Sequence, residues 1–264
     1  MRELIEAIEH RNVILFIGAG VSANMGIPAL PELIRRLADD LGVEAESFQQ
    51  FGDFRSLAEY YALEKNDLSA LRRWMDPADE RNTRHSPIHQ RIVKLGLPLI
   101  YTTNYDRLLE TAFEQAGAEF HRIVNVSDIA GARDGVTQIV KLHGDIRDGP
   151  IVLTESDFFE RLSFESPLDL KLRADVLGKT ILFIGYSLSD INVRYLLYKL
   201  HKQWKDSEFE HARPRSYMHF PRPNPVQERI LQSRGIEPIV DDGDDAEHGV
   251  ARFLDKLLMR RDTQ

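Results

Sequence analysis

The sequence contains no cysteine among its 264 residues. This absence excludes disulfides, thiolate nucleophiles and any zinc site built on cysteine ligands. Long apolar runs are also missing, because no stretch reaches the roughly 18 consecutive apolar residues that a membrane-spanning helix needs. The first residues, Met1 to Ile5, lack the basic-then-apolar order of a signal peptide. We therefore expect a folded cytoplasmic protein with no membrane span and no zinc ribbon.

An excess of positive charge is missing as well. The chain has 34 basic and 42 acidic residues, which gives a formal net charge of −8. Binding of nucleic acid across the surface needs clustered Lys and Arg, so we expect nucleic acid to be reached only through a partner. Hydrophobic residues at 42% and charged residues at 29% are typical of globular proteins. One folded domain over residues 1–264 fits this length and composition.

Short β-branched and aromatic runs alternate with helical patterns along most of the chain. The run Val13–Ile17 is too short for a helix and is followed by a glycine-rich turn. Further strands are expected at 97–102, 138–142, 180–184, 216–220 and 236–240, and helices at 32–41, 105–116, 191–204, 226–233 and 246–259. This alternation predicts an α/β, Rossmann-like fold with a mostly parallel sheet and helices on both faces. Residues from about 44 to 90 show helical spacing without a strand signal, so we expect a helical insertion there.

Glycine-rich or polar segments follow four of the expected strands, at the edge where an open parallel sheet binds its ligands. They are Gly-Ala-Gly-Val-Ser at 18–22, Thr-Asn-Tyr-Asp at 103–106, Lys-Leu-His-Gly-Asp at 141–145 and Gly-Tyr-Ser-Leu at 185–188. Each also has a purely structural interpretation. The glycine turn either offers backbone amides to a pyrophosphate or only connects a strand to a helix. The Asn, Asp and Ser side chains can cap helices, and a single histidine after a strand is more often structural.

The four segments together, in this order, resemble the sirtuin superfamily, in which equivalent segments surround NAD⁺. The sequence departs from the protein deacetylases of that superfamily, because it has no four-cysteine zinc ribbon and its glycine loop continues as Ile-Pro-Ala-Leu-Pro rather than Ile-Pro-Asp-Phe-Arg. With the segments at 153–158 and 185–190, it is similar instead to the SIR2-like domains of bacterial anti-phage defence systems. That resemblance implies an NAD⁺ glycohydrolase that depletes NAD⁺ during abortive infection.

The resemblance also implies roles for individual residues. Asn104 would orient the ribose and the attacking water, Asp106 would hold the nicotinamide carboxamide, and His143 would accept a proton as the base. NAD⁺ is the substrate, no metal is implied, and the residues expected to bind the rest of the dinucleotide are Gly18, Ala19, Gly20, Ser22, Thr103, Gly185 and Ser187. Because nicotinamide leaves as a neutral molecule, the reaction needs stabilisation of a cationic ribose rather than a general acid at the ring nitrogen.

Two other functions are compatible with the same NAD⁺ site. An NAD-dependent deacylase would transfer an acyl group from lysine and would need a peptide groove. A sensing module would bind NAD⁺ or ADP-ribose and control a partner without turnover. The resemblance further implies a homo-oligomer, and a HerA-like ATPase or a short Argonaute as partner. The sequence does not select among these possibilities.

Overall fold

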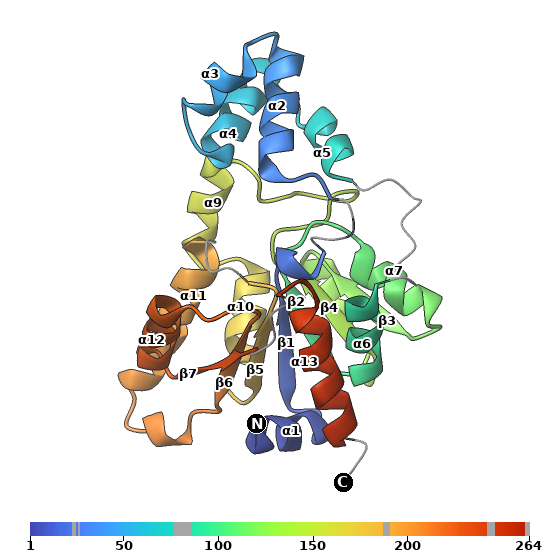
Figure 1. Ribbon diagram of the computed structural model, residues 1–264, viewed down its shortest axis with the longest axis vertical. Coiled ribbons are helices and arrows are strands. Elements are labelled where there is room, and N and C mark those ends of the chain that lie inside the picture. Colours follow the sequence, from blue (N-terminus) through green and yellow to red (C-terminus); the bar gives the residue numbers. More distant parts are fainter. Residues whose placement is uncertain (23–24, 26, 77–85, 187–190, 242–245, 262–264) are drawn as a thin grey trace.

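A seven-stranded sheet forms the centre of the protein in its computed structural model, which describes residues 1–22, 25, 27–76, 86–186, 191–241 and 246–261 (Figure 1). The strands are β1 (Val13–Ile17), β2 (Leu99–Thr102), β3 (Phe120–Ile123), β4 (Thr137–Lys141), β5 (Thr180–Ile184), β6 (Ser216–Phe220) and β7 (Ile236–Val240). The described helices are α1 (Arg2–Glu9), α2 (Leu30–Leu41), α3 (Ala45–Gln49), α4 (Phe54–Lys65), α5 (Ser69–Met75), α6 (Pro87–Leu95), α7 (Leu108–Gln115), α8 (Val126–Ala130), α9 (Glu155–Arg161), α10 (Pro167–Asp175), α11 (Ile191–Lys205), α12 (Pro225–Ser233), α13 (Ala246–Arg261) and the short 3₁₀ turns η1 (Ala19–Val21) and η4 (Glu210–Ala212).

The strands follow the order β3-β4-β2-β1-β5-β6-β7, and every neighbouring pair is parallel. The α/β, Rossmann-like prediction is therefore confirmed. The chain winds from β1 towards β2 on one side and from β5 towards β7 on the other, so the direction reverses beside β1, where such sheets bind ligands. Ile17 pairs with Thr102 and with Ile184, and Thr102 pairs with Lys141. The carboxyl ends of four neighbouring strands are thus level with one another.

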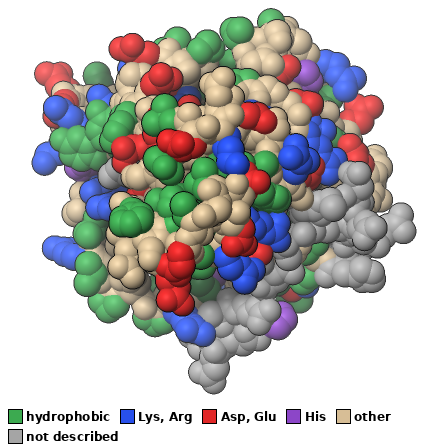
Figure 2. All heavy atoms as spheres, turned by 90° about the horizontal axis from the view of Figure 1, so that it is seen from above, with side chains coloured by type: hydrophobic (Ala, Val, Ile, Leu, Met, Phe, Trp, Pro, Cys, Tyr) green, Lys and Arg blue, Asp and Glu red, His purple; other side chains and the backbone are tan. Residues whose placement is uncertain are grey.

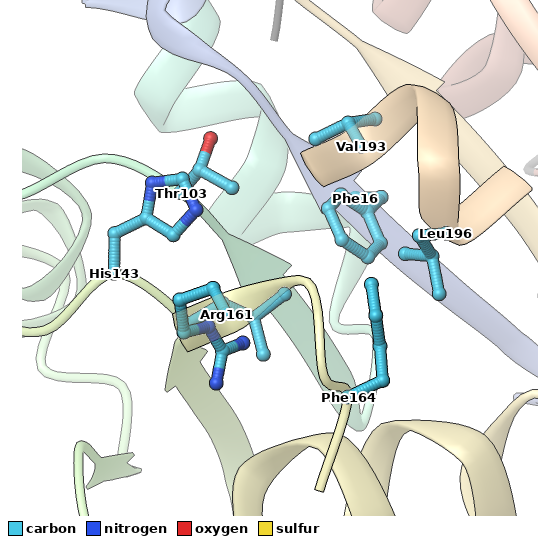
Figure 3. A pocket seen from close by; sticks show the side chains of 8 residues that line it. Phe16, Thr103, His143, Arg161, Phe164, Val193 and Leu196 are labelled. Carbon is cyan, nitrogen blue, oxygen red and sulfur yellow. The ribbon is translucent and has the colours of Figure 1, made fainter. Parts of the chain in front are cut away.

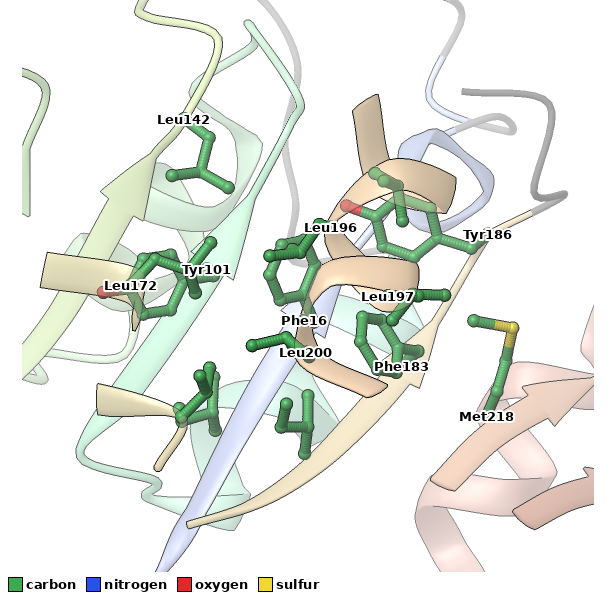
Figure 4. Close-up of a cluster of buried hydrophobic side chains, with 14 of the residues drawn as sticks. Phe16, Tyr101, Leu142, Leu172, Phe183, Tyr186, Leu196, Leu197, Leu200 and Met218 are labelled. Carbon is green, nitrogen blue, oxygen red and sulfur yellow. The ribbon is translucent and has the colours of Figure 1, made fainter. Parts of the chain in front are cut away.

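Alternating strand residues build a separate core on each face of the sheet. On one face α10, α11 and α12 cover a cluster that includes Phe16, Tyr101 and Phe183 (Figure 4). On the other face α1, α6, α7 and α13 cover a cluster that includes Leu15 and Leu182. Burial of both faces explains why β1 and β5 are continuous apolar runs rather than alternating ones. The sheet therefore holds its carboxyl edge between two well-packed layers.

Helices α2 to α5, which we call the helical layer, form a third cluster above the carboxyl edge of the sheet (Figure 1). Their apolar side chains pack together with Ile146, Ile151 and Leu153 from the segment after β4. The insertion expected at about 44–90 overlaps α3 to α5. Helix α2 belongs to the same cluster, whereas α6 packs on the sheet. The helical layer is therefore attached to the sheet close to the ends of its central strands.

Charges of both signs and hydrophobic side chains are interspersed on the face that the helical layer presents (Figure 2). Among the side chains that Figure 2 colours, basic residues do not gather into one large patch on this face. This mixture agrees with the negative net charge. In the described part of the chain, no helix combines the length and the apolar character needed to cross a membrane.

Candidate functional site

The four segments singled out in the sequence lie at one edge of the sheet. Gly18 follows β1, Thr103 follows β2, Leu142 follows β4 and Gly185 follows β5. These strands are direct neighbours, and their carboxyl ends are level. The fold therefore brings together residues that are up to 167 positions apart in the chain (Gly18 to Gly185). Ser187 lies outside the described residues.

The glycine turn after β1 packs directly on the backbone after β5. The Gly18 amide donates to the Ile184 carbonyl and the Gly20 amide to the Gly185 carbonyl, both at 2.9 Å. A Cβ on Gly18 would lie 2.6 Å from the Gly185 oxygen, and one on Gly20 would lie 2.9 Å from it. Gly185 itself has a φ of +69° and would place a Cβ 2.8 Å from the Val21 nitrogen. These glycines are required by the close approach of two backbones.

This packing limits which amides of the turn can bind a ligand. The amides of Gly18 and Gly20 are occupied, and the Ser22 amide donates to the Ala19 carbonyl at 3.0 Å. The Ala19 amide has no acceptor within the described residues, and both Ala19 and Gly20 are exposed. The turn therefore offers an open outer side with one free amide at Ala19, rather than the full row of amides expected from the motif.

Asn104 lies beside the glycine turn and is buried. Its amide nitrogen donates to the Gly18 carbonyl and to the Ser22 hydroxyl, both at 3.3 Å, and its backbone amide donates to the Thr102 hydroxyl at 2.9 Å. Its side-chain oxygen, Oδ1, is buried and has no hydrogen-bond partner in the described structure. A buried acceptor normally finds a donor in the protein, in ordered water or in a ligand. Asn104 thus presents an unused acceptor at the strand ends.

Asp106 is buried two residues further along the same loop. Its Oδ1 accepts from the amide of Leu108, the first residue of α7, at 3.0 Å, as the capping interpretation predicts. Burial raises the pKa of Asp106, although the Leu108 amide, the charge of Lys141 and the Ser22 hydroxyl each act to lower it. The helix expected from about residue 105 begins at Leu108 instead. Ser22 therefore contacts both polar side chains of this loop.

His143 is buried beside two aromatic rings. Its ring centroid is 6.2 Å from that of Tyr105 and 5.3 Å from that of Phe158, which meets it edge-on. Thr103 and His143 line the same small pocket, together with Phe16, Leu142, Arg161, Phe164, Val193 and Leu196 (Figure 3). The pocket leaves about 10 Å³ for water. That is close to the room for a single water molecule, so a ring-sized ligand enters only if these side chains move.

Several residues of the site were not predicted. Tyr186 donates to the Ile17 carbonyl at 3.0 Å and lies 3.1 Å from the Thr103 hydroxyl, so it links the ends of β1 and β2. Arg161 lines the pocket beside His143, and its guanidinium pairs with Asp169 at 2.6 Å. Tyr186 stands inside a segment that the sequence already singled out. Arg161 has no such signal, because only the fold brings the end of α9 to His143.

A second, wider hollow lies away from the strand ends, between α2 and α5. It measures about 450 Å³ and is lined by Arg36, Asp39, Asp40 and Trp74. Two of these groups already have partners, because Arg36 pairs with Glu32 at 2.9 Å and Asp40 accepts from the Tyr61 hydroxyl at 2.8 Å. Its size alone does not make it the reaction site, since it contains none of the four segments. The described residues hold no cluster of His, Asp and Glu suited to a metal ion.

Comparison with known proteins gives a consistent result. A family model described as SIR2-like domain matches residues 98–239. "NAD(+) hydrolase ThsA" of Enterococcus faecium is 31% identical over 202 residues, which cover 75% of this chain and 41% of that protein. The protein of the same name from Acinetobacter baumannii (strain 532279) is 27% identical over 210 residues, covering 79% of this chain and 43% of that protein. "Defense-associated sirtuin 2" of Bacillus subtilis is 28% identical over 215 residues, covering 78% and 21%.

The chain spans less than half the length of each of these relatives. The family model covers more than half of the chain and includes the segments that carry Asn104, His143 and Gly185. These segments converge at the carboxyl edge of one parallel sheet, as the resemblance implies. On this match, the chain belongs to the SIR2-like domain family.

Proposed function

We propose that this chain cleaves the bond between nicotinamide and ribose in NAD⁺ and releases ADP-ribose. The observation that carries the proposal is the unpaired, buried Oδ1 of Asn104 at the carboxyl edge of the sheet. A ribose hydroxyl or a water molecule is the donor that this acceptor lacks. Relatives named NAD(+) hydrolase match the chain over about three quarters of its length, and this supports the same chemistry.

Asn104 and His143 would act on the ribose in this proposal. The Asn104 amide is fixed by Gly18 and Ser22, so its free oxygen points to one place without reorganisation. Such an acceptor can orient a hydroxyl or the attacking water while positive charge develops on the ribose. His143 would accept the proton that the nucleophile loses. The aromatic rings of Tyr105 and Phe158 restrict the orientation of the imidazole.

Asp106 would hold the nicotinamide carboxamide, and the glycine turn would hold the diphosphate. Because burial raises the pKa of Asp106, its carboxyl group is protonated more readily and can then offer a donor as well as an acceptor to a carboxamide. The diphosphate would lie against the exposed side of Ala19 and Gly20, where the Ala19 amide is free within the described residues. Thr103 and Gly185 would line the same crevice, and Ser187 stays a predicted contact of the dinucleotide.

The test follows nicotinamide release from NAD⁺ by the purified chain, alone and with the product of the neighbouring gene. We expect nicotinamide and ADP-ribose in equal amounts. The deacylase alternative predicts instead that an acetylated peptide loses its acetyl group and that nicotinamide release depends on the peptide. Absence of both release and NAD⁺ binding under all conditions would overturn the proposal.

The sensing alternative is favoured by one observation, which is the small volume of the pocket beside His143. In a sensor, NAD⁺ or ADP-ribose would bind tightly and would persist unchanged. Calorimetry combined with product analysis separates the two functions, because the glycohydrolase consumes its ligand. The same small pocket volume is also consistent with an enzyme that becomes active only after a rearrangement of these side chains.

We further propose that residues 1–264 act as one domain with a helical insertion and that the activity serves anti-phage defence. The relatives are longer than this chain, and one is named as defence-associated. A homo-oligomer, or a partner such as a HerA-like ATPase or a short Argonaute, would supply the trigger. Light scattering of the chain with and without such a partner tests this assembly. A monomer in every mixture would rule it out.

A further inference from the structure

Lys141 is the last residue of β4, and its side chain is completely buried, with 0% exposed. Burying an ammonium group is costly unless carboxylates and hydrogen-bond acceptors surround it. The proposed reaction gives this residue no role. Its position, two residues before His143 and level with the end of β2, makes it the strongest unexplained feature of the site.

Four oxygens surround the Lys141 ammonium. Two belong to carboxylates, Asp145 at 2.9 Å and Glu110 at 3.2 Å. The other two are the backbone carbonyls of Tyr105 at 3.0 Å and Asp106 at 2.6 Å. The carboxylates offset the charge, whereas the carbonyls belong to the loop that carries Asn104 and Asp106. Lys141 therefore joins β4 to the loop after β2.

Other backbone hydrogen bonds also hold this loop. The Asn104 amide donates to the Thr102 hydroxyl at 2.9 Å, and the Ile146 amide donates to the Tyr105 carbonyl at 3.1 Å. The two carbonyls that Lys141 binds belong to the two residues immediately after Asn104 in the chain. A movement of these carbonyls would turn the peptide planes on either side of Asp106 and would shift the neighbouring side chains with them.

The other end of the ion pair holds the turn that carries His143. Asp145 is fully buried and accepts from Arg107 at 2.9 Å, from Arg122 at 3.0 Å and from the Arg147 amide at 2.9 Å. Between Lys141 and Asp145 lies Gly144, whose φ of +83° closes the turn and where a Cβ would meet the Pro150 oxygen at 2.0 Å. The ion pair thus brackets His143 at both ends of its turn.

We propose that Lys141 is a positioning residue that fixes the distance between Asn104 and His143. It does so by holding the Tyr105 and Asp106 carbonyls from the strand that leads into the histidine turn. This inference rests on the proposed cleavage of NAD⁺, since the spacing matters only if both side chains act on one ribose. A misplacement of about 1 Å at such a site lowers a rate by about 100-fold.

The first test replaces Lys141 with Met, which keeps an unbranched side chain up to the ε position and removes the ammonium. Asp145 retains Arg107 and Arg122 in this variant. We expect the rate constant for nicotinamide release at saturating NAD⁺ to fall about 100-fold, with NAD⁺ binding changed less than about threefold. Glu110→Gln is the matched control, because it removes a partner of Lys141 while both carbonyl contacts remain, and its rate should stay within about threefold.

A purely structural role for Lys141 predicts a different pattern. Leu257→Ala removes a fully buried side chain from α13 and lowers stability without touching the loop. If Leu257→Ala and Lys141→Met lower the rate equally at equal loss of stability, the positioning role is wrong. Combination with Asn104→Ala is a second criterion, because Lys141→Met should then cost less than about threefold. An undiminished 100-fold loss in that background would overturn the proposal.

Hydrogen exchange separates this inference from the proposed function. We expect the amides of Asn104 and Ile146 to exchange at least about tenfold faster in Lys141→Met than in Glu110→Gln. This measurement does not depend on NAD⁺ cleavage. Unchanged exchange at both amides would overturn the positioning role even in an active enzyme. If instead the exchange changes and the parent chain neither binds nor cleaves NAD⁺, the loop is held as proposed and the proposed function fails.

Discussion

Two halves of the candidate site are built in different ways. The glycine half, at the ends of β1 and β5, consists of backbones in direct contact through Gly18, Gly20 and Gly185. The lysine half, at the ends of β2 and β4, is held by the buried ammonium of Lys141 and its carboxylates. The glycine half cannot accept an added atom, and the lysine half cannot lose the ammonium of Lys141. A surface that binds a diphosphate needs bare backbone, whereas one that performs acid-base chemistry needs side chains held in place.

Substitution of Asn104 and His143 should affect the rate more than any other change in the lysine half. Asn104→Ala or His143→Ala should lower nicotinamide release by about 2 to 4 orders of magnitude, because each removes a positioned group that we propose acts on the ribose or the proton. Asn12→Ala is the matched control for asparagine, since Asn12 bonds the Gly178 carbonyl and follows α1. His10→Ala, at the end of α1, is the control for histidine. Cleavage at the parent rate by His143→Ala would contradict the assignment of the base.

A single methyl group should disturb the glycine half. Gly18→Ala places a Cβ 2.6 Å from a backbone oxygen, so the two turns must separate. We expect a loss of about 3 kcal/mol in the free energy of unfolding, at the upper end of the usual cost of overpacking, together with weaker NAD⁺ binding. Gly178→Ala is the control, because a Cβ there meets no atom within 4 Å. Equal stability of the two variants would show that the turns are not in contact as described.

The sequence predicted more of the sheet than of the site. The apolar runs of β1 and β5 identify buried parallel strands without any structural information. Strand β3 was missed because it has four residues, three of them half-buried, and resembles a short polar connection. Helices α1, α8, α9 and α10 were also missed. Prediction of order and type was better for long periodic segments, because short elements owe their structure to neighbours far away in the chain.

Contacts between distant segments were beyond prediction. The glycine motif indicated a turn, but no local pattern indicated that the amides of Gly18 and Gly20 bond to the segment after β5. Lys141 belongs to the segment at 141–145, yet nothing in the local sequence indicates that it is fully buried or that it donates a hydrogen bond to the Tyr105 carbonyl. The same contact explains why α7 starts at Leu108 rather than near residue 105, since the ammonium holds the preceding carbonyls outside the helix.

Two buried histidines outside both halves should control stability at acid pH without affecting the chemistry. Burial lowers the pKa of His89 and of His219 from 6.5 to about 4. Since the unfolded chain takes up protons first as pH falls, their contribution to stability is complete above pH 6.5 and is lost progressively towards pH 4. Between pH 7 and pH 5 each should cost about 2 kcal/mol. Urea unfolding of His219→Phe at both pH values checks this, and an unchanged pH dependence would contradict it.

A contact between the helical layer and the lysine half should have a smaller effect. The Arg55 guanidinium of α4 lies 4.2 Å from the ring centroid of Phe158, whose edge meets His143. Arg55→Met should lower stability by about 0.5 to 1 kcal/mol through loss of this cation–π contact and should lower the rate less than about threefold. Lys199→Met, which removes a similar contact with Tyr195 on α11, is the control and should leave the rate unchanged. A larger effect of the control would show that the helical layer has no particular link to His143.

We propose that Asn104 and His143 face one ribose while the glycine half holds the diphosphate. A crystal structure of His143→Ala with NAD⁺ tests it most directly, because the variant should bind the dinucleotide without consuming it. We expect a ribose hydroxyl or a water molecule on the Asn104 Oδ1 and phosphate oxygens against the Ala19 amide. A dinucleotide bound elsewhere, or an Asn104 Oδ1 that remains unpaired in the complex, would contradict it.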